Sequence, residues 1–172
     1  MIYLIAGASH TGKTVLAQKI LVEKKIPYLS LDHLKMGLIR SGNTDLTVFD
    51  DDKLRDYLWP IAREMVKTAI ENGQSLTIEG CYIPHSWAED FDETYRSQIQ
   101  AVWLIMTPEY ISTNFSAIQS YANVIEQRLD DTQYTIENAL KENAHVLEQV
   151  CQNGENYILI DSRYELEIPE LQ

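Results

Sequence analysis

The sequence is short of positive charge and of cysteine, and each shortage excludes a class of function. Its 172 residues hold 14 lysines and arginines against 26 aspartates and glutamates, a formal net charge of −12. A protein that binds a nucleic-acid backbone needs a positively charged surface, and 14 lysines and arginines among 26 acidic residues are too few to form one. The cysteines, Cys81 and Cys151, lie far apart and form no CxxC pair. We therefore expect reduced, buried thiols, no cysteine metal site and no nucleic-acid partner.

Long apolar runs are missing as well. No run approaches the ~20 residues that a membrane-spanning helix needs. The first apolar run starts at residue 2, so we expect no signal peptide, because its cationic start would have no room. The sequence thus predicts a cytoplasmic protein with no membrane partner. With 45% hydrophobic and 23% charged residues, it also predicts a single globular domain over residues 1–172 and leaves the oligomeric state open.

What the chain does have is a phosphate-binding loop. The apolar run Ile2–Ala6 leads straight into Gly7-Ala8-Ser9-His10-Thr11-Gly12-Lys13-Thr14, and a helical pattern follows. Backbone N–H groups of such a loop form a nest for phosphate, and the helix dipole adds positive charge. Lys13 is expected to reach the β- and γ-phosphates, and the Thr14 hydroxyl to bind magnesium. The loop predicts a site for ATP with Mg²⁺.

Strand and helix patterns alternate along the chain. Short apolar runs, typical of strands buried on both faces of a parallel sheet, occur at Ile2–Ala6, Pro27–Leu31, Ser75–Gly80, Ala101–Thr107 and Tyr157–Asp161. Helical spacing of apolar residues spans Lys13–Lys24, Asp51–Asn72 and a third stripe from Ile136 to Cys151 that ends at Gly154. Pro60 predicts a kink or a break in the second of these. The alternation predicts an α/β fold with a parallel sheet.

Two segments interrupt the simple alternation. Residues 33–73 follow the second expected strand, and residues 108–134 follow the fourth. Ligands of open α/β sheets bind beyond the carboxyl ends of the strands, where both segments emerge. We expect residues 33–73 to bind the acceptor and residues 108–134 to form a lid.

Two carboxylates stand at the ends of expected strands. Asp32 closes the second strand, where it could accept a proton from an attacking hydroxyl or bind the acceptor. It could instead cap a helix that starts at His33. Glu79 closes the third strand after Leu76-Thr77-Ile78, the Walker B pattern. Its carboxylate would hold magnesium or an acceptor hydroxyl, because a charge on a buried strand is costly without such a partner.

Few cations are available to complete the site. Arg40 could present a bidentate fork to an anionic acceptor, or lie in solvent. Lys35 is expected at the surface. Arg128 is the sole cation between Thr107 and Lys141. It could neutralise the transferred phosphoryl group or stack on adenine, or pair with Asp131 on an exposed helix. Arg163, after the last strand, is expected near the base of the nucleotide.

These motifs resemble those of the P-loop small-molecule kinases, such as adenylate, shikimate and gluconate kinases. The resemblance rests on Gly7–Thr14 and is otherwise positional. It implies a three-layer fold with five parallel strands in the order 2-3-1-4-5, and a mobile lid. It matches Asp32 and Arg40 to the acceptor-binding aspartate and arginine, and Arg128 to a lid arginine. Adenylate kinases carry several lid arginines, so a single Arg128 and the Asp32-His33 pair favour a hydroxyl acceptor.

Two alternatives to a hydroxyl kinase remain. One is a nucleoside monophosphate kinase of the adenylate type. The other, from a different class, is a regulatory or non-catalytic ATP-binding NTPase. The guanine-binding Asn/Thr-Lys-x-Asp element and a DxxG motif after the third strand are both missing. The sequence does not name the acceptor.

Overall fold

The core of the protein is one parallel sheet. The structure is a computed structural model that describes residues 1–121 and 134–169. The strands are β1 (Ile2–Gly7), β2 (Tyr28–Ser30), β3 (Leu76–Glu79), β4 (Ile99–Met106) and β5 (Tyr157–Ile160). They pair in parallel in the order β2-β3-β1-β4-β5. The predicted α/β class and strand order are confirmed.

Helices connect the strands. They are α1 (Lys13–Lys24), α2 (Leu31–Arg40), α3 (Asp51–Glu71), α4 (Glu93–Arg96), α5 (Pro108–Tyr121) and α6 (Ile136–Asn153), with a short 3₁₀ turn, η1, at Trp87–Asp90. Of the predicted kink or break at Pro60, the break is wrong, because α3 continues through Pro60 as one helix, and the kink stays a prediction. Pro60 lies on the exposed side of α3, while Leu58, Trp59 and Ala62 pack into the core. That packing holds the helix together where one backbone hydrogen bond is missing.

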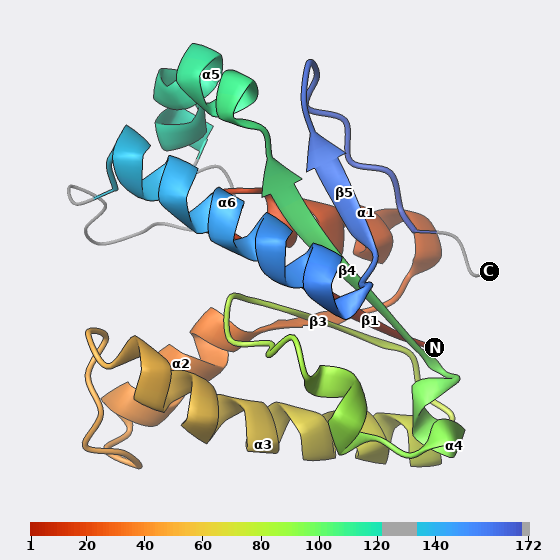
Figure 1. Ribbon diagram of the computed structural model, residues 1–172. Helices are drawn as coiled ribbons and strands as arrows, with labels where there is room; N and C mark the ends of the chain where they lie inside the picture. Colours follow the sequence, from red (N-terminus) through yellow and green to blue (C-terminus); the bar gives the residue numbers. More distant parts are fainter. Residues whose placement is uncertain (122–133, 170–172) are drawn as a thin grey trace.

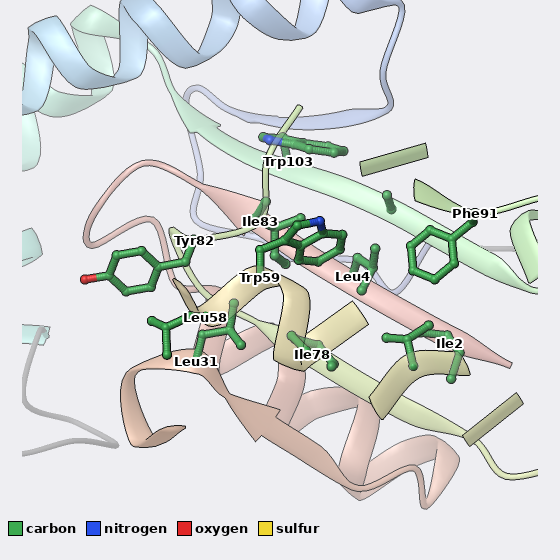
Figure 2. Packing of buried hydrophobic residues seen from close by; sticks show 14 of the residues in the cluster. Ile2, Leu4, Leu31, Leu58, Trp59, Ile78, Tyr82, Ile83, Phe91 and Trp103 are labelled. Atoms are coloured by element: carbon green, nitrogen blue, oxygen red, sulfur yellow. The ribbon is translucent and has the colours of Figure 1, made fainter. Parts of the chain in front are cut away.

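Alternation along the strands divides the core between two faces. Ile2 and Leu4 of β1 face one apolar cluster, which includes α3 and the second half of α6. Tyr3 and Ile5 face the other, which includes α1 and α5. Figure 1 shows α3 and α6 on one side of the sheet and α1 on the other. In Figure 2 the Trp59 ring of α3 lies over the sheet near Leu4. The result is the predicted three-layer arrangement.

The strand register brings the ends of three strands together. Glu79, the last residue of β3, lies opposite Ile5 of β1 and Ser30 of β2. Because all strands run the same way, the loop after β1, the start of α2 and the loop after β3 emerge at one edge. In a parallel sheet this carboxyl edge is where ligands bind.

The two segments expected to serve as acceptor region and lid are built differently. Residues 33–73 consist mainly of α2 and α3. Residues 108–121 form α5, whose Ile111 and Ile118 are buried in the second cluster. The remainder of the expected lid, 122–133, falls outside the described residues. Both roles stay predictions.

Two predictions from composition can be compared with the structure. The thiols were expected to be buried, but Cys81 and Cys151 are both free and both residues are exposed. The Cys81 thiol itself nevertheless lies beside the buried Lys13, and burial raises its pKa. Cys151 lies near the end of α6, and Cys81 lies two residues after the end of β3. Among the described residues, none of the helices is long and apolar enough to cross a membrane.

Candidate nucleotide-binding site

The loop between β1 and α1 depends on two glycines with positive φ. At Gly7 φ is +131°, and a Cβ would lie 2.3 Å from the carbonyl oxygen of Leu104 on β4. At Gly12, the N-cap of α1, φ is +92°, and a Cβ would lie 1.6 Å from the Tyr164 hydroxyl. Both angles favour glycine, because L side chains rarely adopt them, and at Gly7 the backbone of β4 also leaves no room for a Cβ. The chain can therefore turn tightly from β1 into α1, as the sequence predicts.

Lys13, the first residue of α1, folds back over this loop. Its side chain is buried, and its Nζ donates to the carbonyl oxygens of Ala8 at 2.7 Å and Gly7 at 3.2 Å. Burial by itself lowers the pKa of Lys13, but Cys81, Glu79 and Glu142 nearby raise it, and the net shift is upward. Lys13 is therefore a fixed positive charge at the loop, where the sequence places the phosphates.

Glu79 is a buried carboxylate beside that charge. It is 2% exposed at the end of β3 and attracts Lys13 electrostatically. Thr14, in the first turn of α1, is half-buried. A carboxylate and a hydroxyl are hard oxygen donors, which suit Mg²⁺ when phosphates and water supply its other ligands. No group of three or more acidic, histidine or cysteine side chains fit for a metal occurs in the described part of the chain.

Asp32 does not lie where the sequence predicts. Strand β2 ends at Ser30 and α2 begins at Leu31, so Asp32 stands in the first turn of the helix. Both the strand-end placement and a cap for a helix starting at His33 are wrong. Leu31 is fully buried against Gly80, where a Cβ on Gly80 would meet it at 2.8 Å, and it is already the first residue of α2. The apolar pattern does not separate a buried residue at the start of a helix from one at the end of a strand, so it placed the boundary too late.

Lys35 belongs to the site, contrary to the prediction of a surface position. Its side chain is 14% exposed, and its Nζ lies 2.5 Å from Asp32 Oδ1 and 3.1 Å from the Tyr82 hydroxyl. The Tyr82 hydroxyl in turn donates to Asp51 Oδ1 at 2.9 Å. Figure 2 shows this hydroxyl pointing away from the apolar cluster. Burial, followed by the nearby Asp51, raises the pKa of Tyr82. The network ties α2, α3 and the loop after β3 around Asp32.

The predicted arginines are not brought into this arrangement. Arg40, the last residue of α2, is exposed. Arg163 has an 81% exposed side chain at 4.0 Å from Glu165. Its neighbour Tyr164 reaches the loop instead, with its hydroxyl 3.5 Å from the carbonyl oxygen of Thr11. Arg128 lies outside the described residues. The roles assigned to the three arginines stay predictions.

Sequence reasoning missed two residues that contact the loop from the far end of the chain. Glu142 of α6 accepts hydrogen bonds from the Ser9 backbone N–H at 2.8 Å and the Ser9 hydroxyl at 3.0 Å. Tyr134 donates to the Ser9 carbonyl oxygen at 3.2 Å, and its ring lies 3.9 Å from that of His10. Neither residue belongs to a motif, so no sequence signal could have found them.

Asn143 fixes helix α6 against the sheet. It is 3% exposed, its Oδ1 accepts from the backbone N–H of Met106 at 2.8 Å, and its Nδ2 donates to the carbonyl oxygen of Ala139. Met106 is the last residue of β4, so this bond holds α6 beside the carboxyl edge. Glu142, the residue that precedes Asn143, is thereby held beside the loop.

We expect Asn143→Ala to lower the free energy of unfolding by about 1–3 kcal/mol, because the Met106 N–H is left buried without an acceptor. Chemical denaturation measures the change. Asn153→Ala, an exposed site at the end of the same helix whose side chain bonds only to the Gln149 carbonyl, is the matched control. Equal losses for both variants would show that Asn143 does not anchor the helix.

Comparison with known proteins identifies the fold. No model of a known protein family matches this sequence, and no curated protein matches it. A provisionally assigned kinase from Chloroflexus aurantiacus superposes with a TM-score of 0.58 at 16% identity, covering 94% of this chain and 87% of that one. Deoxyadenosine kinase from M. mycoides gives 0.56 at 15% identity, covering 97% and 92%. Shikimate kinase from Bacteroides thetaiotaomicron gives 0.51 at 14%, covering 98% and 89%.

At sequence identities of 14% to 16%, the comparison supports a shared backbone fold and nothing finer. The superposed backbone covers 87% to 92% of each of these chains, so the likeness extends over the whole fold and is not confined to one motif. The protein has the fold of the P-loop small-molecule kinases.

Proposed function

We propose that the protein is a kinase that transfers the γ-phosphoryl group of ATP to a hydroxyl of a small molecule. The observation that carries this proposal is the buried Lys13 ammonium, held over the phosphate loop by two loop carbonyls and flanked by the buried Glu79. A buried cation beside a loop of backbone N–H groups is suited to bind and stabilise a transferring phosphoryl group.

Each residue of the site has a distinct task in this proposal. The backbone of residues 7–14 holds the phosphates, and Lys13 leaves its loop carbonyls to contact them. Thr14 and Glu79 hold Mg²⁺, which neutralises charge on the phosphates. Phosphoryl transfer needs little covalent chemistry from the protein, so charge and position account for most of the catalysis.

Asp32 is proposed to bind the acceptor and take the proton from its hydroxyl. Its side chain is 33% exposed at the same edge as the loop, and Lys35 and, through it, Tyr82 hold it in place. Lys35 is already paired with Asp32, which leaves this part of the site better suited to a hydroxyl than to an anionic acceptor such as a nucleoside monophosphate. This favours the hydroxyl kinase over the adenylate type.

One experiment distinguishes the hydroxyl kinase from the adenylate-type kinase and from a non-catalytic ATP-binding protein. ADP formation from ATP and Mg²⁺ is measured across a panel of sugars, metabolite alcohols and nucleoside monophosphates. A hydroxyl kinase gives ADP production that a neutral or polyhydroxylated acceptor stimulates at least about tenfold. Stimulation by nucleoside monophosphates alone would favour the adenylate type. Slow hydrolysis that no compound stimulates would favour the non-catalytic or regulatory ATP-binding protein.

Arg128 is proposed to act on the transferred phosphoryl group. A positioned arginine is worth on the order of 10³–10⁵ in turnover in phosphoryl-transfer systems, and here Lys13 and magnesium would remain. We therefore expect Arg128→Ala to lose at least about a hundredfold in kcat with the acceptor that the panel identifies. Arg96→Ala, at an exposed position on α4, is the control and should leave kcat unchanged. A loss under tenfold for Arg128→Ala would contradict the role.

A further inference from the structure

The phosphate loop already holds an anion supplied by the protein itself. One carboxylate oxygen of Glu142 accepts both the backbone N–H and the hydroxyl of Ser9, the third residue of the loop, across 133 positions of sequence. The same carboxylate attracts the buried Lys13. Glu142 therefore uses two of the attractions that a bound phosphate would use: a loop amide and the loop lysine.

The contact is built into the fold. Asn143 fastens α6 to the end of β4 through the Met106 N–H, and Tyr134 holds the Ser9 carbonyl oxygen from the segment that leads into α6. Glu142 is half-buried between these two anchors. Its carboxylate is thus delivered to Ser9 by a helix that is itself fixed to the sheet, and hydrogen bonds to a charged acceptor are stronger than those to a neutral one.

The phosphates of a nucleotide at the loop would be repelled by the Glu142 carboxylate. Phosphate groups carry negative charge, and in a partly buried site two anions that share one cation and one set of donors repel each other. Glu79 lies beside the same lysine, so the surroundings of Lys13 are already rich in carboxylates. A nucleotide can gain full use of the loop only when Glu142 gives up Ser9.

We propose that Glu142 is an internal competitor for the phosphates of the nucleotide, and that nucleotide binding displaces it from Ser9. This rests on the proposed function, since the loop must bind a nucleotide. The Glu142 carboxylate holds the loop at Ser9, and nucleotide binding includes the release of that carboxylate. The apparent affinity for the nucleotide then equals the intrinsic affinity multiplied by the fraction of molecules in which Glu142 is not bonded to Ser9.

Two variants of Glu142 separate charge from contact. Glu142→Gln keeps an oxygen that can accept the Ser9 N–H but removes the charge, and Glu142→Ala removes both. We expect each to bind MgADP about tenfold tighter than the unmodified protein, as measured by calorimetry. Glu148→Gln removes one negative charge from an exposed position on the same helix and is the matched control, with an expected change under about twofold.

Inorganic pyrophosphate is the second probe, because it tests anion competition without a base or ribose. It should also bind more tightly to both Glu142 variants and unchanged to Glu148→Gln. Circular dichroism and thermal unfolding establish that each variant is folded. Unchanged or weaker binding of both probes to folded Glu142 variants, while the unmodified protein binds MgADP, would overturn the inference alone. Failure of every protein to bind either probe would overturn the proposed function together with it.

Discussion

Replacement of Lys13 by alanine is expected to reduce kcat by about a thousandfold or more while the protein stays folded. The Lys13 ammonium is a buried positive charge fixed at the phosphate loop, bonded to the Ala8 and Gly7 carbonyls. Removal of a single donor that stabilises developing negative charge typically costs 10²–10³ in turnover, and the lysine of a phosphate loop also positions the phosphates. Steady-state ADP production with the best acceptor of the panel measures the loss.

The control for Lys13→Ala must account for stability. Removal of the cation leaves Glu79 and Glu142 without the charge that they face, so some loss of unfolding free energy is expected as well. Lys24→Ala, at the exposed last turn of the same helix, removes a lysine without touching the loop. Thermal unfolding of both variants separates loss of catalysis from loss of fold. Near-normal turnover of folded Lys13→Ala would remove the basis for the phosphate-loop assignment.

Replacement of Asp32 by asparagine is expected to lower kcat by about 10²–10⁴, the range attributed to a general base, with little change in ATP affinity. Asparagine preserves the size of the side chain and can still bond to Lys35, but it cannot take a proton. The loss should therefore fall on the chemical step. Acceptor-dependent ADP formation gives kcat, and calorimetry with MgADP gives the nucleotide affinity.

Asp45→Asn, an exposed acid in the loop after α2, is the matched control and should leave both quantities unchanged. A fall in nucleotide affinity with normal kcat in Asp32→Asn would make Asp32 a ligand of the metal or a structural residue. Normal values for both would assign the proton transfer to another group.

Helix α1 and the strands of the sheet show how closely local sequence patterns predict the bounds of helices and strands. Lys13–Lys24 was predicted with its observed bounds, because the loop glycines and a stretch of helix-forming residues lie next to each other in sequence. The strands were located within a few residues because each is a short, mainly apolar run. The expected burial on both faces is wrong for β5, which is an edge strand and largely exposed. The strand ends were less certain: β2 is shorter than predicted, and α2 starts earlier, because the packing of Leu31 is a tertiary effect.

By itself the sequence determined the glycine loop between β1 and α1, the place of Lys13 and the buried carboxylate of Glu79. All three follow from residues adjacent to one another along the chain. Only the tertiary structure decided that Lys35 forms an ion pair with Asp32 and that Glu142 accepts a hydrogen bond from the Ser9 backbone N–H. Periodicity indicates which face of a helix is apolar, but not which polar side chain it will carry to a residue 133 positions away. That is set by how helices pack on the sheet, a property of the whole chain.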